Sequence, residues 1–159
     1  NGLEVNRFKD QVWDLLRSIS ENMDRAFRPF TEKEKLTMIQ ARVLIEVGQC
    51  GTHTIGSLGK RLGIASANAS ALCKRLEKEG FLFRSRDGQD ERLVHLTLTP
   101  FGRSALERIH TAMKERYHDV FQEKDQEKLD TILNGLYTLN DLLKRMGNNQ
   151  PDQNKEASI

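Results

Sequence analysis

Residues 54–98 constrain the fold of this chain most strongly, because they hold two short helical patterns separated by a glycine. Three apolar residues lie at the spacing of one helical face: Ile55, Leu58 and Leu62. Gly63 is suited to the left-handed conformation that ends a helix. A second helix is expected from Ser66, a favourable N-cap residue, to about Gly80. Its expected buried face consists of Ala69, Leu72, Cys73 and Leu76. Two short helices joined by a tight turn predict a helix-turn-helix.

The following residues are suited to a β-hairpin. Residues 81–86 and 93–98 can pair as strands, because apolar and polar side chains alternate along the second segment. Between the two segments, Asp87-Gly88 is a strong turn signal. Three arginines flank this turn: Arg84, Arg86 and Arg92. A helix-turn-helix followed by a basic hairpin predicts a winged helix, so the expected fold class is mainly α with a small β-hairpin wing.

A series of short motifs occurs in a fixed order across about half of the chain. It consists of Leu36-Thr37 with Gln40 to Leu44, Leu58 to Leu62, Ser70, Leu72 with Arg75 to Gly80, Arg84, Asp90-Glu91-Arg92, and Leu96 to Gly102. With these motifs the chain resembles the MarR family of bacterial transcriptional regulators. The resemblance implies a winged helix-turn-helix that binds DNA. It also implies a homodimer in which the first, fifth and sixth helices of two copies entwine.

Amphipathic helices are expected before the motif. Apolar residues spaced by three and four positions run from Val5 to Ile19 and predict a long helix over about residues 3–27. Pro29 is expected to interrupt this helix, since the residue before a proline is disfavoured in the helical region. Thr37 and Gln40 form a capping-box pattern for a helix that ends near Gly48.

Two further helices are expected after the hairpin. Thr99-Pro100 is suited to begin the first of them. Its expected buried side consists of Leu106, Ile109, Met113, Val120 and Phe121. Asp125 is suited to cap the second, whose apolar stripe consists of Leu129, Ile132, Leu136, Leu139, Leu143 and Met146. The alternative to a dimer is that both terminal stripes pack only within their own chain.

This reading gives one MarR-like domain over residues 1–146. Its DNA-binding lobe spans about 37–98, and its dimerisation helices span about 3–27 and 100–146. The remaining residues, 147–159, are polar and contain Pro151, so a disordered tail is expected.

The charge distribution favours a nucleic-acid partner. The net charge of the chain is only +2, but residues 60–92 carry eight Lys or Arg against five Asp or Glu. No apolar run is long enough to span a membrane. The two cysteines do not form a disulfide framework. A cytoplasmic protein without a cofactor is therefore expected.

Candidate DNA contacts lie on the second helix of the motif and on the hairpin. They are Ser66, Ala67, Asn68, Ser70, Ala71, Lys74, Arg75, Arg84, Arg86, Asp90 and Arg92. Asn can pair with adenine, and Ala can contact the thymine methyl group. Ser70 and Lys74 are suited to phosphate contacts. Many relatives carry an Arg in the first turn of this helix, and this chain has none. Asn68 is equally compatible with an ordinary exposed residue.

The family resemblance also gives roles to two hairpin residues and to a small-molecule site. It implies that Asp90 braces the wing and that Arg92 approaches DNA; the alternative is a solvated hairpin with surface ion pairs. In relatives, a crevice between the DNA-binding lobe and the dimerisation helices accepts phenolic or aromatic carboxylate ligands. Candidate lining residues here are Trp13, Phe27, Phe30, Met38 and Arg42, although such residues are more often part of a core.

Other classes of function are weaker. The sequence contains no phosphate-binding glycine loop, nucleophile elbow or zinc-protease motif, so an enzyme is not expected. The four histidines do not form a metal-ligand set. His53 is expected in a turn, His95 on a strand, and His110 and His118 on one helix.

Two alternative functions stay open. One is a winged-helix protein-interaction module, and the other is a thiol-based redox regulator that uses Cys50, in an expected loop, or Cys73, which is expected to be buried. The preferred function is a homodimeric regulator, expected to be a repressor, that binds a pseudo-palindromic operator and is released by a small aromatic ligand.

Overall fold

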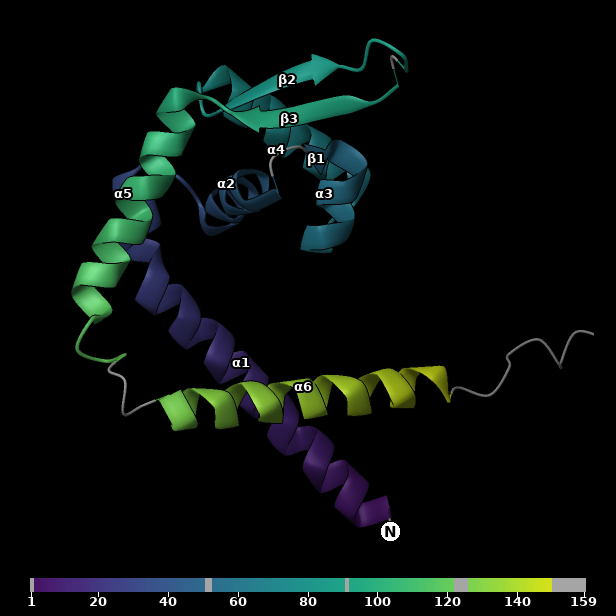
Figure 1. The fold of residues 1–159 in the computed structure, drawn as a ribbon. Helices are drawn as coiled ribbons and strands as arrows, with labels where there is room; N and C mark the ends of the chain where they lie inside the picture. Colours follow the sequence, from purple (N-terminus) through teal and green to yellow (C-terminus); the bar gives the residue numbers. More distant parts are fainter. Residues whose placement is uncertain (1, 51–52, 91, 122–125, 150–159) are drawn as a thin grey trace, which may run out of the picture. The chain divides into compact units, whose positions relative to one another are not determined.

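The computed structural model describes residues 2–50, 53–90, 92–121 and 126–149 of the chain. Its elements in order are α1 (Gly2–Lys33), α2 (Met38–Cys50), β1 (His53–Thr54), α3 (Ile55–Leu62), α4 (Ser66–Lys78), β2 (Leu82–Arg86), β3 (Val94–Leu98), α5 (Pro100–Tyr117) and α6 (Gln126–Asn148), as Figure 1 shows. The chain divides into two compact units, residues 1–115 and 116–159. The first unit contains the predicted helix-turn-helix and wing, so the predicted fold class is confirmed.

The three strands form one antiparallel sheet in the order β1-β3-β2. In the β2–β3 hairpin, Leu82 lies opposite Leu98 and Arg86 lies opposite Val94. The hairpin was therefore predicted correctly to within one residue at each strand. Strand β1 was not predicted: His53, which was expected in a turn, pairs with Leu96 of β3. A strand of two residues is too short to show any alternation in the sequence.

The two helices of the motif, α3 and α4, approach each other closely. A methyl group added at Gly59 would lie 3.1 Å from the carbonyl oxygen of Ile64, so glycine permits this approach. Gly63 ends α3 with φ of +67°, as predicted. The prediction that Ser66 caps α4 is wrong by one residue: the cap is Ala65, which offers no side-chain hydrogen bond, and Ser66 is the first helical residue.

The first helix continues past Pro29 and ends at Lys33, so the predicted interruption and the boundary at residue 27 are wrong. Proline removes one backbone hydrogen bond, but ion pairs of Arg28 with Asp24 and with Glu32 span the same turn. The chain instead leaves the helix at Lys35, which has φ of +58°. There the N–H of Leu36 donates to the carbonyl of Thr31, which is the bonding pattern of a Schellman motif.

Helix α2 begins as predicted, because the backbone N–H of Thr37 donates to Gln40 Oε1 and the N–H of Gln40 donates to Thr37 Oγ1. It continues to Cys50 rather than ending near Gly48, so Cys50 is helical and not in a loop. Its buried face packs with the other elements of the first unit. The largest fully buried side chains are Leu44, Leu58, Leu76, Leu82, Leu96, Val43, Val47 and Cys73.

Helix α5 begins at Pro100, and the Thr99 hydroxyl accepts from the N–H of Gly102, as the sequence predicted. Leu106 and Ile109 are buried, and Met113 is half-buried. The helix ends at Tyr117, so the prediction that Val120 and Phe121 lie on its buried side is wrong; both are exposed. For the same reason, His118 does not share a helix with His110.

The second unit contains α6, which has no buried residue in the single chain. Its predicted apolar stripe is therefore largely exposed, as is that of α1. Residues 147 and 148 continue the helix and do not belong to a disordered tail; Asp125 and residues 150–159 lie outside the described residues. Within the part that the structure describes, no helix combines the length and apolarity that a bilayer crossing requires.

Candidate nucleic-acid interface

The solvent-facing side of α4 changes character along its length. Ala67, Ala71, Lys74 and Lys78 are exposed, and their spacing places them on one helical face. The face therefore carries methyl groups near the N-terminus of α4 and ammonium groups near its C-terminus. Asn68 and Arg75 are exposed beside this face, and Ser66 is exposed at the first helical position. Ser70 is half-buried, so it is less accessible than the other candidates on this helix.

The wing (residues 82–98) has a longer connection than a two-residue turn, because β2 ends at Arg86 and β3 begins at Val94. Asp87 organises this connection. Its Oδ1 accepts from the backbone N–H of Gln89 at 2.8 Å, and its Oδ2 lies 3.0 Å from His95 Nε2 on β3. These hydrogen bonds, chiefly the one from Gln89 and then the one from His95, lower the pKa of Asp87 from its ordinary value of 3.8.

A second aspartate in the wing holds the backbone of Arg92. The N–H of Arg92 donates to Asp90 Oδ1 at 3.0 Å, and the N–H of Leu93 donates to the Asp90 carbonyl. The side chain of Arg92 is exposed. The wing thus presents a guanidinium group whose backbone is fixed by a neighbouring carboxylate.

The other candidate arginines are arranged differently. Arg84 Nε donates to Glu77 Oε1 at 3.1 Å, and the side chain of Arg84 is only 23% exposed. Arg84 therefore connects β2 to α4 rather than extending into solvent. Arg75 Nε lies 3.1 Å from Glu79 Oε1 within α4, and its side chain is 72% exposed. Arg86 is exposed at the end of β2.

These pairs concentrate positive charge on one surface. Glu77, Glu79 and Asp87 each have a cationic or histidine partner. No ion pair is recorded, within the described parts of residues 53–98, for four cations: Lys60, Lys74, Lys78 and Arg92. These three carboxylates are thus engaged within the protein, and the basic face of α4 and the wing is available to a polyanion.

Two carboxylates that hold the wing, Glu77 on α4 and Asp87 in the wing, were given no bracing role from the sequence. For Glu77, the sequence signal is its place before Gly80, with Arg84 after it. Because the chain reverses direction at Gly80, the two side chains can meet as an ion pair. The signal for Asp87 is its position at the start of a turn, where Asp often accepts from the N–H two residues later.

The structure does not favour thiol chemistry at Cys73. The side chain is fully buried, and burial raises its pKa to about 11, although Arg84 acts in the opposite direction. A thiol with such a pKa is almost entirely protonated at neutral pH and is a poor nucleophile. The side chain of Cys50 lies outside the described residues. Nor do the described residues contain a group of three or more His, Cys, Asp or Glu suited to a metal ion.

The predicted small-molecule candidates do not gather into one site. Trp13 is 73% exposed and Phe30 is buried on the same continuous helix, about 25 Å apart at 1.5 Å per residue. One chain therefore cannot place both residues around a small ligand. Phe27 and Met38 are half-buried, and Arg42 is exposed on α2.

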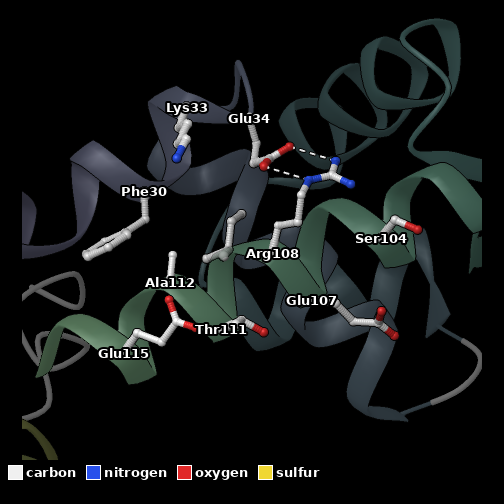
Figure 2. Close-up of a pocket in the computed structure, with 10 residues that line it drawn as sticks. Phe30, Lys33, Glu34, Ser104, Glu107, Arg108, Thr111, Ala112 and Glu115 are labelled. Carbon is white, nitrogen blue, oxygen red and sulfur yellow. Dashed lines mark hydrogen bonds and ion pairs between the residues drawn. The ribbon is translucent and has the colours of Figure 1, made fainter. Parts of the chain in front are cut away.

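A cavity of about 540 Å³ instead lies between the C-terminal end of α1 and α5, both within the first unit. It is lined by Phe30, Lys33, Glu34, Ser104, Glu107, Arg108, Ile109, Thr111, Ala112 and Glu115, most of which Figure 2 labels. Of the predicted candidates, only Phe30 belongs to this lining. The volume lies in the range of small-molecule sites.

Across this cavity, Arg108 binds Glu34 in a bidentate ion pair, with Nε–Oε1 at 2.8 Å and Nη2–Oε2 at 2.9 Å (Figure 2). The hydrogen bond from Arg108 is the main reason that the pKa of Glu34 lies below its usual value. The pair connects the turn after α1 with α5, and therefore fixes one wall of the cavity against the other.

The helix-turn-helix, the braced wing and the basic face define a winged-helix DNA-binding protein. The family model described as MarR family matches residues 36–94. The regulator SarZ of Staphylococcus haemolyticus is 30% identical over 129 residues, which cover 80% of this chain and 85% of SarZ. The chain belongs to the MarR family and is a transcriptional regulator, not an enzyme.

Two further similar proteins match four fifths or more of this chain. The organic hydroperoxide resistance transcriptional regulator of Bacillus subtilis is 26% identical over 87% of this chain and 93% of its own length. A solved structure of BpsR from Bordetella bronchiseptica has a TM-score of 0.64 and 25% identity, and covers 80% of this chain and 98% of that one. The BpsR structure concerns regulation of its DNA binding by 6-hydroxynicotinic acid.

The wing geometry predicts how Asp87 titrates. Because its pKa is lowered in the folded protein, its contribution to the free energy of unfolding is present above the unfolded-state pKa and is lost as pH falls through the folded value. NMR titration of the Asp87 carboxyl carbon should show this lowered pKa. His95→Ala should raise it only in part, since the larger effect comes from the Gln89 N–H. A complete return to the ordinary value in His95→Ala would contradict this assignment.

Proposed function

We propose that this protein is a homodimeric repressor that binds a pseudo-palindromic operator, with α4 in the major groove and the wing against an adjacent minor groove. The observation that carries the proposal is the outer face of α4, which is small and apolar at one end and basic at the other, beside the exposed Arg92. A dimer bound to an operator excludes other proteins from the same DNA, so repression is the proposed effect. The place of action is the cytoplasm, where a bacterial operator lies.

The proposed contacts follow from the exposed chemistry of α4. Ala67 and Ala71 allow close approach to base edges and can contact thymine methyl groups, and Asn68 can pair with adenine. Lys74 and Arg75 are suited to phosphates, as is the exposed hydroxyl of Ser66. The N-terminal N–H groups of α4 donate to no capping side chain, because Ala65 has no acceptor there, which suits them to a phosphate oxygen. Ser70 has a smaller proposed part because it is half-buried.

In the wing, Arg92 is the proposed minor-groove residue. Its guanidinium keeps its charge at all relevant pH values and suits the negative potential of a narrow minor groove. Asp90 holds its backbone, and Arg86 is a second exposed arginine on the same hairpin. Arg84 is not proposed to contact DNA, because its side chain binds Glu77.

The wing contact can be tested with Arg92→Ala. Operator affinity should fall by about 1–3 kcal/mol, while the melting temperature stays close to that of the wild type, because Arg92 is exposed. Arg17→Ala is a matched control: it removes the same charge from α1, where Arg17 pairs with Asp14 and Glu21. Fluorescence anisotropy against a duplex selected by the wild-type protein from a random library measures both. Equal affinities for the two variants would refute the wing contact.

The dimer is proposed from the exposed apolar stripes of α1 and α6, each considered by itself. Exposed large apolar residues on α6 include Ile132, Leu136, Leu143 and Met146, and those on α1 include Val5, Phe8, Leu15 and Ile19. Such continuous apolar stripes at helical spacing are unfavourable in water and typical of helices that pack against another surface. We propose that a second copy of the chain covers them, so that residues 1–146 act as one domain within the dimer.

Leu136→Lys tests the stripe on α6. It should shift the protein from dimer to monomer or to aggregates, because it places a charge in the proposed interface. Asn134→Lys introduces the same charge on the opposite side of α6 and should leave the dimer intact. Sedimentation analysis over a range of concentrations measures the assembly state. An unchanged dimer in Leu136→Lys would show that this stripe is not the interface.

The cavity between α1 and α5 is the proposed effector site. Phe30 and Ile109 offer apolar surface, while Glu34, Glu107 and Glu115 outnumber Lys33 and Arg108 among its charged residues. This excess of negative charge disfavours an anionic ligand, unless the ligand takes the place of the Glu34 carboxylate on Arg108. A neutral phenol, which can donate to a carboxylate and lie on Phe30, fits better. A ligand in this cavity would lie between α5 and the end of α1, which the Arg108–Glu34 ion pair joins. By changing that connection it would change how α5 holds α4 and the wing, and so the affinity for DNA.

Calorimetry with 4-methylphenol, benzoate and salicylate tests this site. The neutral phenol should bind more tightly than benzoate, and Glu107→Ala should narrow the difference, because it removes a repelling charge. Binding to the operator-bound protein should be weaker than to the free protein; a 100-fold loss of DNA affinity requires a coupling of about 2.7 kcal/mol. Equal affinity with and without operator would exclude the compound as an effector, and tighter binding of benzoate would refute the charge argument.

A further inference from the structure

Glu77, in the last turn of α4, binds β2 at two points. Its Oε2 accepts from the backbone N–H of Arg84 at 3.1 Å, and its Oε1 accepts from Arg84 Nε at 3.1 Å. The first hydrogen bond matters most here, because it holds the strand itself and not only a flexible side chain. One carboxylate therefore joins α4 to the middle of β2, because Arg84 is the third of the five residues of this strand.

The surroundings of this carboxylate favour a rigid connection. The side chains of Glu77 and Arg84 are 36% and 23% exposed, so solvent screens them less than a fully exposed ion pair. Arg84 lies opposite the fully buried Leu96 in the sheet register. Against the larger effect of burial, which raises the pKa of Cys73, the charge of Arg84 lowers it. The middle of β2 is thus held where α4, β2 and β3 meet.

We propose that Glu77 is a positioning residue for DNA binding: it sets the orientation of the wing on α4, so that Arg92 and the outer face of α4 meet the same DNA. This inference rests on the proposed contact of Arg92 with DNA. Strand β2 has five residues and is about 16 Å long at roughly 3.3 Å per residue. A rotation of about 10° about its Leu82 end would move its Arg86 end by about 3 Å, the length of a hydrogen bond, and a contact at Arg84 opposes such a rotation.

Glu79 provides a matched control. It lies two residues further along the chain, carries the same charge, and pairs with Arg75 within α4. Removal of either carboxylate makes the surface more positive, so simple attraction to DNA predicts tighter binding for both variants. A positioning role predicts weaker operator binding for the Glu77 variant, and for that variant alone. The direction of the change therefore separates the two explanations.

The experiment measures operator dissociation constants for Glu77→Ala, Glu79→Ala, Arg92→Ala and the double variant Glu77→Ala/Arg92→Ala, using the selected duplex. Glu77→Ala should bind about tenfold more weakly, equivalent to about 1.4 kcal/mol. Glu79→Ala should bind as tightly as the wild type or slightly more tightly. The dissociation constant of the double variant should lie within about twofold of that of Arg92→Ala. Without the Arg92 side chain, the wing contact is already lost, so the orientation of the wing no longer affects operator affinity.

Three results would overturn the inference. In the first, Glu77→Ala binds as tightly as Glu79→Ala, so that only charge matters. In the second, the losses from Glu77→Ala and Arg92→Ala multiply, so that the two residues act independently. In the third, Arg92→Ala binds like the wild type, which refutes the proposed wing contact itself and is distinguishable from the first two.

A second variant tests whether weaker binding by Glu77→Ala merely reflects a loss of folding. Glu77→Asp keeps the charge but shortens the side chain, so that it no longer reaches both donors of Arg84. It should show the same loss of affinity as Glu77→Ala, with a melting temperature above the assay range. Wild-type affinity in Glu77→Asp would overturn the positioning role.

Discussion

The arrangement of the first unit depends on the contacts of Phe81, the residue at which the chain leaves α4 for the wing. Its N–H donates to the Leu76 carbonyl, and its carbonyl accepts from the N–H of Thr99 at 3.1 Å. A methyl group added at Gly102 would overlap that same carbonyl, so only glycine allows α5 to begin there. The Phe81 ring packs on Phe101 with centroids 5.0 Å apart. Helix α4, the hairpin and α5 therefore diverge from one tightly packed point.

This point would connect the proposed effector site to DNA binding. The start of α5 is held by Phe81, through the N–H of Thr99 and the ring of Phe101, and Arg108, further along the same helix, binds Glu34 across the cavity. A rigid helix transmits a tilt along its length, so a ligand that separates Arg108 from Glu34 can change how α4 and the wing are presented. The requirement is that the ligand binds the DNA-bound and free conformations with different affinity.

Local signals in the sequence predicted the features that local interactions decide. Gly63 ends α3, and Thr37 with Gln40 begins α2, because the relevant hydrogen bonds join neighbouring residues. The errors arose where distant contacts decide. Burial of Phe30 and Thr31 accompanies continuation of α1 past Pro29. The pairing of Arg84, a candidate DNA contact, with Glu77 was not predicted. The cavity was missed because its walls join residues 74 positions apart, as in the Glu34–Arg108 pair.

The composition of α4 gives a reason why the proposed complex would depend on the orientation of the wing. The outer face of its first two turns carries Ala67 and Ala71, which offer no hydrogen bonds to bases, and no arginine able to read guanine. In the proposed complex, direct readout by the helix depends on Asn68 and on methyl contacts. The remaining discrimination in that complex comes from groove shape, read by arginines of the wing, and from the spacing of two half-sites. Both depend on rigid geometry more than on individual contacts. In this proposal, the carboxylate of Glu77 affects which DNA is recognised, although it does not itself contact a base.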